Sequence, residues 1–148
     1  MTERTQKNIL PEGLLFGEAN FEERMRKEVQ PWLKNQVKEG YFRSWDGSRI
    51  HYLSAVHPGE RAAVVFSHGF CEFSGKYHEM MYYFYQMGYS VFFMEHRGHG
   101  FSRRFLKDLH KVYVKSYQEY VKDLHVFVEG IVKRRSESGE LYLFAHSM

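Results

Sequence analysis

The 148 residues of this sequence suffice for one modest domain with a hydrophobic core and are too few for two ordinary domains. The content of hydrophobic residues (43%) and aromatic residues (18%) excludes an intrinsically disordered chain. The net charge of +3 comes from Lys and Arg spread among Asp and Glu, so we predict no nucleic-acid partner.

Cysteine content and apolar segments indicate the compartment. The single cysteine, Cys71, excludes an internal disulfide framework and fits a reducing compartment. A lone cysteine is most often a small buried hydrophobe, which is what we expect of Cys71. No segment has the pattern of a signal peptide or of a membrane-spanning helix. The sequence therefore predicts a cytoplasmic protein.

The N-terminal region predicts a loosely held leader and a short helix. Residues 1–19 are mostly polar, with interspersed proline and glycine. From Asn20, a predicted N-cap, apolar residues recur on one helical face until Pro31 ends the pattern. We assign residues 1–39 to this leader and docking helix, and residues 40–148 to the folded domain.

A hairpin and two buried strands are expected next. Residues 41–56 hold two β-prone runs split by Asp46-Gly47, a pair that tolerates the positive φ angles of a tight turn. The run "AAVVFSHG" is continuously apolar, as expected for a strand covered on both faces of a largely parallel sheet. Residues 77–87 predict a helix whose aromatic run belongs to the core, and residues 89–96 predict a second buried strand.

Residues 116–135 give the strongest helical pattern. Ser116 and Glu119 have the spacing of a capping box. Residues 140–145, "ELYLFA", predict a third buried strand, so the hairpin and the alternating elements together predict an α/β architecture with right-handed crossovers. Seven apolar residues of the helix are expected on one buried face: Tyr117, Tyr120, Val121, Leu124, Val128, Ile131 and Val132.

Chemistry is expected after the three buried strands, because open α/β sheets bind ligands at the carboxyl ends of their strands. Ser147 follows the third strand directly, as in a nucleophile elbow. In that sharp turn the hydroxyl stands clear of the backbone and the next N–H is free to donate to an oxyanion. His96 and His99 suggest a metal pair, but no acidic or cysteine cluster completes a coordination shell. We therefore predict no metal site.

The motifs "SHGFCEFSGKYHEM", "MEHRGHGFSRR" and "FAHSM", in this order, resemble the N-terminal half of an α/β-hydrolase of the lysophospholipase and monoacylglycerol lipase type, the serine aminopeptidase-like hydrolases. The "AHSM" form is most similar to bacterial lysophospholipase L2 relatives. The resemblance implies a β-hairpin followed by alternating parallel strands and helices, truncated at the nucleophile elbow. Residues 40–148 are then an incomplete α/β-hydrolase domain.

Site roles follow from the resemblance. Ser147 matches the nucleophile, and the backbone N–H groups of Phe70 and Met148 match the oxyanion hole. His68 and Gly69 match the residues that shape the loop before Phe70. Fixed N–H dipoles of this kind stabilise the charge that develops on the tetrahedral intermediate.

The sequence departs from the monoacylglycerol lipase form "HGxGEHSGRY" at Cys71 and Phe73, where that form has Gly and His. Both residues make the loop bulkier, which leaves the substrate open. In this fold the acid and the base follow the serine in chain order, and only Met148 follows Ser147. We therefore expect a fragment that is inactive alone.

The expected parent protein is a serine hydrolase that cleaves carboxylic esters of lipids through an acyl-enzyme. Two alternatives stay open: a hydrolase of small esters or peptides with the same fold, and a non-catalytic interaction domain derived from a hydrolase. We expect no cofactor and no obligate protein partner. The expected partner is a lipid ester substrate, and the resemblance leaves transient contact with a membrane surface, and thus a peripheral location, open.

Overall fold

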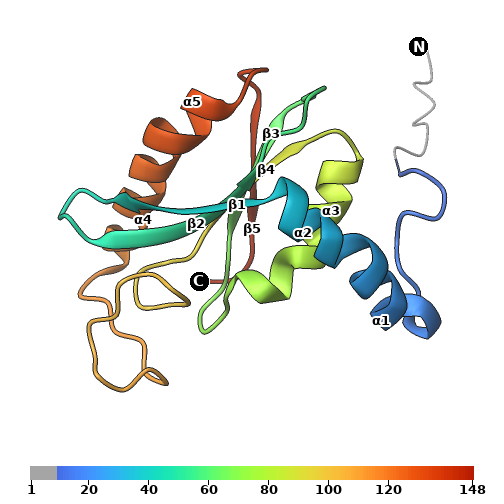
Figure 1. Cartoon of the computed structure of the whole chain (residues 1–148). Coiled ribbons are helices and arrows are strands. Elements are labelled where there is room, and N and C mark those ends of the chain that lie inside the picture. The colour runs from blue at the N-terminus through green and yellow to red at the C-terminus, as the bar shows by residue number, and fades with distance from the viewer. Residues whose placement is uncertain (1–9) are drawn as a thin grey trace, which may run out of the picture.

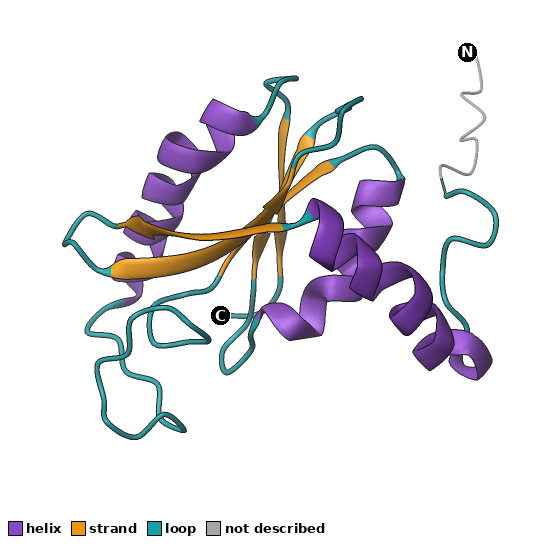
Figure 2. Ribbon diagram, viewed as in Figure 1, coloured by secondary structure: helices purple, strands orange, loops and turns teal. Residues whose placement is uncertain are grey.

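The computed structural model describes residues 10–148 of the chain, so the first half of the predicted leader lies outside the described residues. Five strands form one mixed sheet in the order β1-β2-β4-β3-β5, with helices on both of its faces (Figures 1 and 2). The strands are β1 (Lys38–Arg43), β2 (Arg49–Ala55), β3 (Ala63–Ser67), β4 (Ser90–Met94) and β5 (Leu141–Ala145).

The strand pairing confirms the predicted hairpin and the α/β class. β1 and β2 are antiparallel, and Gly47 has the positive φ of 80° that the turn between them requires. β2 is also antiparallel to β4, whereas β3 is parallel to both β4 and β5. The carboxyl ends of β3, β4 and β5 therefore meet at one edge of the sheet.

Helices alternate with the strands as predicted. Figure 1 shows α1, α2 and α3 beside one face of the sheet and α4 with α5 beside the other. The α-helices are α1 (Phe21–Arg24), α2 (Gln30–Gln36), α3 (His78–Gln86), α4 (Tyr117–Phe127) and α5 (Lys133–Arg135). Wider π turns at Met25–Val29 and Val128–Val132 connect α1 to α2 and α4 to α5, and 3-10 turns cover Glu18–Asn20 and Ser74–Tyr77.

The prediction that Pro31 ends the first helix is wrong. The helical path continues through Pro31 to Gln36, because a π turn precedes the proline and a new α segment begins at Gln30. Proline is tolerated in the first turn of such a segment, where its missing N–H is not needed. Asn20 is placed at the N-cap of α1, but its side chain accepts from the N–H of Gly17 and does not cap the helix.

The described part of the leader is packed rather than loosely held. Leu14 is buried in the core. The N–H of Phe16 donates to the hydroxyl of Tyr83 over 2.9 Å, and the two rings meet edge to face. The aromatic side chains of α3 therefore extend the core as far as residue 14.

Two apolar clusters cover the two faces of the sheet. On one face Trp32 and Met81 pack with Phe66 and Phe93, and on the other Phe127 from α4 packs with residues of β2, β3 and β4. β3 and β4 are buried along nearly their whole length, which confirms them as buried strands, and the aromatic run of α3 lies mainly in the core.

The prediction that residues 140–145 form a third buried strand is only half right. The strand forms, but β5 lies at the edge of the sheet and pairs with β3 alone. Tyr142 and Leu143 are each 59% exposed. An apolar run fixes the tendency to form a strand, whereas burial depends on what covers it.

The buried face of α4 also differs from the predicted stripe. Tyr117 and Val121 are 72% and 59% exposed, whereas Asp123 and Phe127 are fully buried. The side chain of Ser116 accepts from the N–H of Gln118 and caps the helix. Compared with the predicted face, α4 is therefore rotated so that a polar side chain points to the interior. The pattern of apolar residues gives no sign of such a contact.

That contact is an ion pair between Arg97, in the loop after β4, and Asp123 of α4, both without exposed surface. Two guanidinium nitrogens lie 2.7 Å from the two carboxylate oxygens. Arg97 also donates to Asp46 of the hairpin turn over 3.0 Å. One cation thus joins the hairpin, the loop after β4 and α4.

We expect Asp123→Ala to lower the free energy of unfolding by about 3 to 5 kcal/mol, because it leaves a buried guanidinium without its main partner. The double change Arg97→Met/Asp123→Leu should restore most of this loss, since it removes both charges. Urea unfolding followed by circular dichroism measures both. Asp108→Ala, which breaks a surface pair with Lys111 and an exposed hydrogen bond from the N–H of His110, is the control and should cost about 1 kcal/mol or less. Equal losses for Asp108→Ala and Asp123→Ala would contradict the assignment.

The edge position of β5 predicts self-association of the 148-residue chain through this strand, because an apolar edge without lysine or proline can pair with another copy. Leu143→Lys should raise the soluble, monomeric fraction in size-exclusion chromatography. Leu15→Lys is a matched control, because Leu15 is similarly exposed (57%) but lies outside the sheet. If the two variants behave alike, edge pairing does not limit solubility.

Candidate active site

Ser147 lies in a strained turn directly beyond β5. Its φ of 57° and the φ of 68° at Met148 are both in the left-handed region, which residues other than glycine seldom adopt. The amide of His146 still donates to the carbonyl of Ser67 at the end of β3, over 3.1 Å. The chain thus leaves the sheet at His146 and turns sharply at Ser147, as expected for an elbow.

The loop after β3 touches this turn at Gly69. A Cβ on Gly69 would lie 3.1 Å from the Cβ of Ser147, 3.1 Å from Nδ1 of His146 and 2.9 Å from the carboxylate of Glu72. A side chain at position 69 would therefore crowd both segments, and glycine lets them lie close together. The structure therefore brings Gly69 and Ser147, predicted separately from two motifs, into direct contact.

His68 holds the base of the same loop. Its side chain is fully buried, its Nε2 accepts from the N–H of His96 over 2.9 Å, and its Nδ1 lies 2.7 Å from the carbonyl of Gly69. An accepting Nε2 places the proton on Nδ1, which donates to Gly69. Burial lowers the pKa of His68 to about 4, so the ring is neutral. Its position fits the loop-shaping role that the resemblance implies.

Glu72 fixes the far side of the loop, and the sequence reasoning gave it no role. One carboxylate oxygen accepts from the N–H of Gly69 over 2.7 Å and from the hydroxyl of Tyr77 over 2.5 Å, and it lies 3.3 Å from Nδ1 of His146. Hydrogen bonds from Tyr77 and Gly69 lower the pKa of Glu72 to about 2. The sequence did contain a signal for this role, because Glu72 follows the glycine of the loop and precedes Tyr77.

The N–H of Phe70 stays free between its hydrogen-bonded neighbours. Gly69 donates to Glu72, and Cys71 donates to Nε2 of His99 over 3.1 Å. Within residues 10–148 neither Phe70 nor Met148 donates its N–H to another residue. Both N–H groups are therefore available to a ligand.

The expectation that Cys71 is buried is wrong. Cys71 has a φ of 59° at the tip of the loop, and its side chain is exposed. The left-handed turn directs the side chain outward while the N–H points inward to His99. Backbone conformation, which the residue type does not reveal, decides its exposure.

A cavity of about 360 Å³ opens beside Ser147, between the elbow and α4. Its wall is largely apolar, with Val121 and Leu124 from the helix. His96 and Tyr120 also line it, and Nδ1 of His96 and the hydroxyl of Tyr120 are buried with no partner among the described residues. Because these two atoms are themselves buried, the surface that the cavity offers is mainly apolar.

His96 is poorly suited to act as a base for Ser147. Its Nε2 lies 3.2 Å from the hydroxyl of Ser67, not from that of Ser147. Burial, together with the neighbouring His68 and His99, lowers the pKa of His96 to about 3. His146 contacts Glu72. Across residues 10–148 the structure shows no hydrogen bond between a histidine and the Ser147 hydroxyl.

A second buried carboxylate, Glu95, joins the loops after β3 and β4. It accepts from the N–H groups of Ser74 (3.0 Å) and Phe101 (2.7 Å) and lies 2.8 Å from Nδ1 of His51. Burial acts to raise the pKa of Glu95, but these hydrogen bonds outweigh it and lower the pKa to about 2. A Cβ on Gly100 would lie 2.2 Å from the carboxyl carbon of Glu95, so glycine is required there.

In the part of the chain that the structure covers, no three His, Cys, Asp or Glu residues gather to hold a metal ion. His96 and His99 instead pack with Tyr120. Their imidazoles are part of the polar interior behind the cavity.

The strand order, the strained serine after β5 and the glycine loop packed against it define a lipase- and esterase-type α/β-hydrolase fold. The chain belongs to the family described as serine aminopeptidase, S33, whose profile matches residues 58–148.

The relatives are lipid hydrolases by name. Lysophospholipase L2 of Escherichia coli is 36% identical over 113 residues, which cover 76% of this chain and 33% of that protein. A monoacylglycerol lipase of Mycolicibacterium smegmatis is 32% identical over 74% of this chain and 38% of its own length. The solved structure of a soluble variant of monoglyceride lipase from Saccharomyces cerevisiae superimposes with a TM-score of 0.58 and 25% identity, over 75% of this chain and 34% of that one.

The chain thus spans about a third of the length of the curated relatives that it matches.

The buried neutral histidines predict a specific pH dependence of stability. Because the folded-state pKa values of His68 and His96 (about 4 and about 3) lie below the ordinary value of 6.5, the unfolded chain binds more protons. The free energy of unfolding should therefore fall as the pH is lowered from 6.5 toward 4. The carboxylates with lowered pKa values change the free energy of unfolding only below about pH 4.5.

His96→Gln should reduce this slope by up to about 1.4 kcal/mol per pH unit, measured by urea unfolding at several pH values. His125→Gln, at an exposed histidine of α4, is the control and should leave the slope unchanged. A slope that is the same in all three proteins would show that His96 is not held neutral.

Proposed function

We propose that this chain carries the nucleophile and the oxyanion hole of a serine hydrolase that cleaves carboxylic esters of lipids. The observation that carries the proposal is the strained turn at Ser147, which lies close against Gly69 of the loop after β3. Such strain places a serine hydroxyl at the edge of the sheet and leaves the N–H of the following residue free.

In the proposed reaction, the Ser147 hydroxyl attacks the ester carbonyl and forms a tetrahedral intermediate. The N–H groups of Phe70 and Met148 donate to its oxyanion, and collapse of the intermediate expels the alcohol and leaves an acyl-enzyme. The free state of both N–H groups supports this role. Water then releases the acid and regenerates the serine.

The base and the acid of this reaction are not proposed among the described residues. His96 faces Ser67 and His146 faces Glu72, and the low pKa of His96 makes it a weak base. In this fold the acid and the histidine follow the serine in chain order. The 148-residue chain alone should therefore not turn over substrate.

The substrate class is proposed from the cavity and from the named relatives. The apolar wall formed by Val121 and Leu124 suits an acyl chain or the alkyl part of an ester. Lysophospholipids and monoacylglycerols, the substrates named in the relatives, both carry such an acyl chain.

A chimera tests the proposal. Residues 1–148 are joined to the part of Escherichia coli lysophospholipase L2 that follows its matched segment, and release of fatty acid from lysophosphatidylethanolamine and monoacylglycerol is measured. We expect activity that Ser147→Ala lowers by about 10³-fold or more, together with loss of labelling by a fluorophosphonate.

Ser67→Ala is the matched control, because Ser67 is the serine that actually lies beside a histidine. It should retain most of the activity and all of the labelling. A folded chimera in which Ser67→Ala, rather than Ser147→Ala, abolishes labelling would overturn the assignment. Ser147-dependent turnover by the 148-residue chain alone would show that an upstream histidine serves as the base.

A further inference from the structure

A long loop projects from the carboxyl edge of the sheet. Between β4 and α4 the chain runs from Glu95 to Ser116 without a helix or strand. Figure 1 shows the outer part of this loop extending beyond the rest of the fold, at the same end as the C-terminus. We refer to residues 101–117 as the basic loop.

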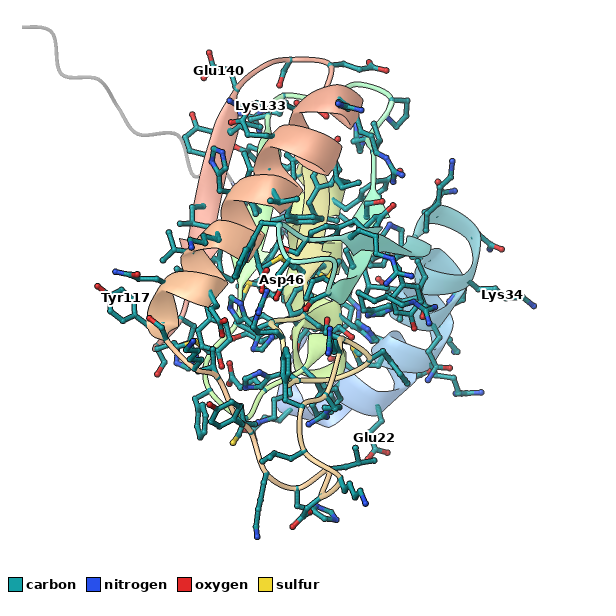
Figure 3. The ribbon with its side chains drawn as sticks, turned by 90° about the vertical axis from the view of Figure 1, so that its left-hand side faces the viewer. Glu22, Lys34, Asp46, Tyr117, Lys133 and Glu140 are labelled. Carbon is teal, nitrogen blue, oxygen red and sulfur yellow. The ribbon has the colours of Figure 1, made fainter. Side chains whose placement is uncertain are left out.

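Large apolar side chains of the basic loop face solvent. Phe101 is 70% exposed, Leu109 63% and Tyr113 50%. Figure 3 shows Tyr117, at the start of α4, directed away from the molecule. Exposed apolar side chains in such numbers mark a contact surface, because single soluble domains seldom expose them together. The exposed set of the loop is Phe101, Phe105, Leu106, Leu109, Tyr113 and Tyr117.

The same loop carries a local excess of positive charge. It holds five Lys and Arg residues against one Asp, an excess larger than the net charge of +3 of the whole chain. Arg103, Lys107, Lys111 and Lys115 are exposed. Asp108 lies 3.6 Å from Lys111, a surface pair that screens little of this charge.

The fifth cation, Arg104, gives the loop its shape. Its guanidinium donates to the carbonyl of Gly98 over 2.7 Å and to that of Leu109 over 3.2 Å. The backbone of Arg103 is tied to Arg49 of β2 over 2.9 Å. The apolar and cationic side chains are therefore presented on a backbone that is fixed at its base.

We propose that the basic loop binds the surface of a bilayer that contains anionic phospholipids, with its apolar side chains inserted at the headgroup boundary and its cations on the phosphates. Interleaved lysines and large apolar residues are the composition that such interfaces bind. Leu106 and Leu109 are aliphatic and offer no ring on which bases could stack, which favours a bilayer over a single-stranded nucleic acid. The proposal does not depend on the proposed catalytic function.

Vesicle flotation tests the proposal, because aggregated protein does not float. The 148-residue chain is mixed with vesicles of phosphatidylcholine and phosphatidylglycerol (about 3:1) or of phosphatidylcholine alone. We expect flotation with the anionic vesicles, weaker flotation without anionic lipid, and a decrease as salt is raised.

Two double variants separate the two contributions. Lys107→Glu/Lys111→Glu and Leu106→Ser/Leu109→Ser should each weaken binding about tenfold or more. Lys133→Glu/Arg134→Glu is the matched control. These exposed cations lie in α5, at the far end of the helical path that begins at Tyr117, where Figure 3 labels Lys133. Vesicle binding of this variant should be unchanged. Circular dichroism checks that each variant is folded.

Three results would overturn the proposal. The first is equal flotation of the control and both loop variants, and the second is no flotation with anionic vesicles. The third is binding to duplex DNA that is tighter than to vesicles and insensitive to Leu106→Ser/Leu109→Ser, which would identify a nucleic-acid surface instead. Because none of these readouts involves Ser147, the proposed hydrolase function is tested separately.

Discussion

The buried ion pair of Arg97 and Asp123 is the constraint on which the geometry of the site depends. Desolvating two charges costs several kcal/mol each unless they meet in good geometry, and here the guanidinium and the carboxylate meet along two bonds of 2.7 Å. The pair fixes the rotation of α4 and the start of the loop after β4 together. Since α4 forms one wall of the cavity beside Ser147, this polar contact acts together with the packing of Phe127 on the sheet to set the width of the cavity.

Carboxylates and imidazoles of the loops after β3 and β4 decide which N–H groups remain free. Glu72 accepts from Gly69, His99 accepts from Cys71, and Glu95 accepts from Ser74. Phe70, between Gly69 and Cys71, has no such acceptor among the described residues. Because the donors on both sides of it are engaged, the N–H of Phe70 is held in place with no partner among the described residues. A fixed, unused donor of this kind suits the oxyanion-hole role that we propose for Phe70.

The sequence predicted which segments form helices and strands better than it predicted which side chains surround them. Continuous apolar runs identified β3 and β4, and Asp46-Gly47 identified the hairpin, because these signals are local. The partner of Arg97 is 26 residues away on α4, and no periodicity of apolar residues reveals that a charged side chain such as Asp123 faces the interior. The same limit explains the misplaced face of α4.

The site was foreseen only in part for the same reason. The serine after β5 and the glycine of the loop after β3 are local motifs, and the structure brings them into contact. The roles of Glu72 and Glu95 depend on which N–H groups the folded chain brings near them, so residue types alone did not reveal them. Pro31 and Cys71 were misjudged because their outcomes depend on backbone geometry, a π turn in one case and a positive φ in the other.

The many aromatic residues of the sequence fall into two groups that lie in different surroundings. One part packs around α3, where Tyr82, Tyr83 and Tyr85 are buried against the sheet, and its burial contributes to folding at about 25 cal/mol per Å². The other part lies at the carboxyl edge, on Phe70, Phe101 and the rest of the basic loop, where the exposed side chains keep 38% to 72% of their surface in water, so folding buries less of it. Apolar side chains that remain this exposed, on a loop whose backbone is already fixed by Arg104, are available for contact with something outside the chain. Because that edge also carries Ser147, a surface bound by the basic loop would lie beside the cavity, where a lipid could pass from one to the other without crossing water.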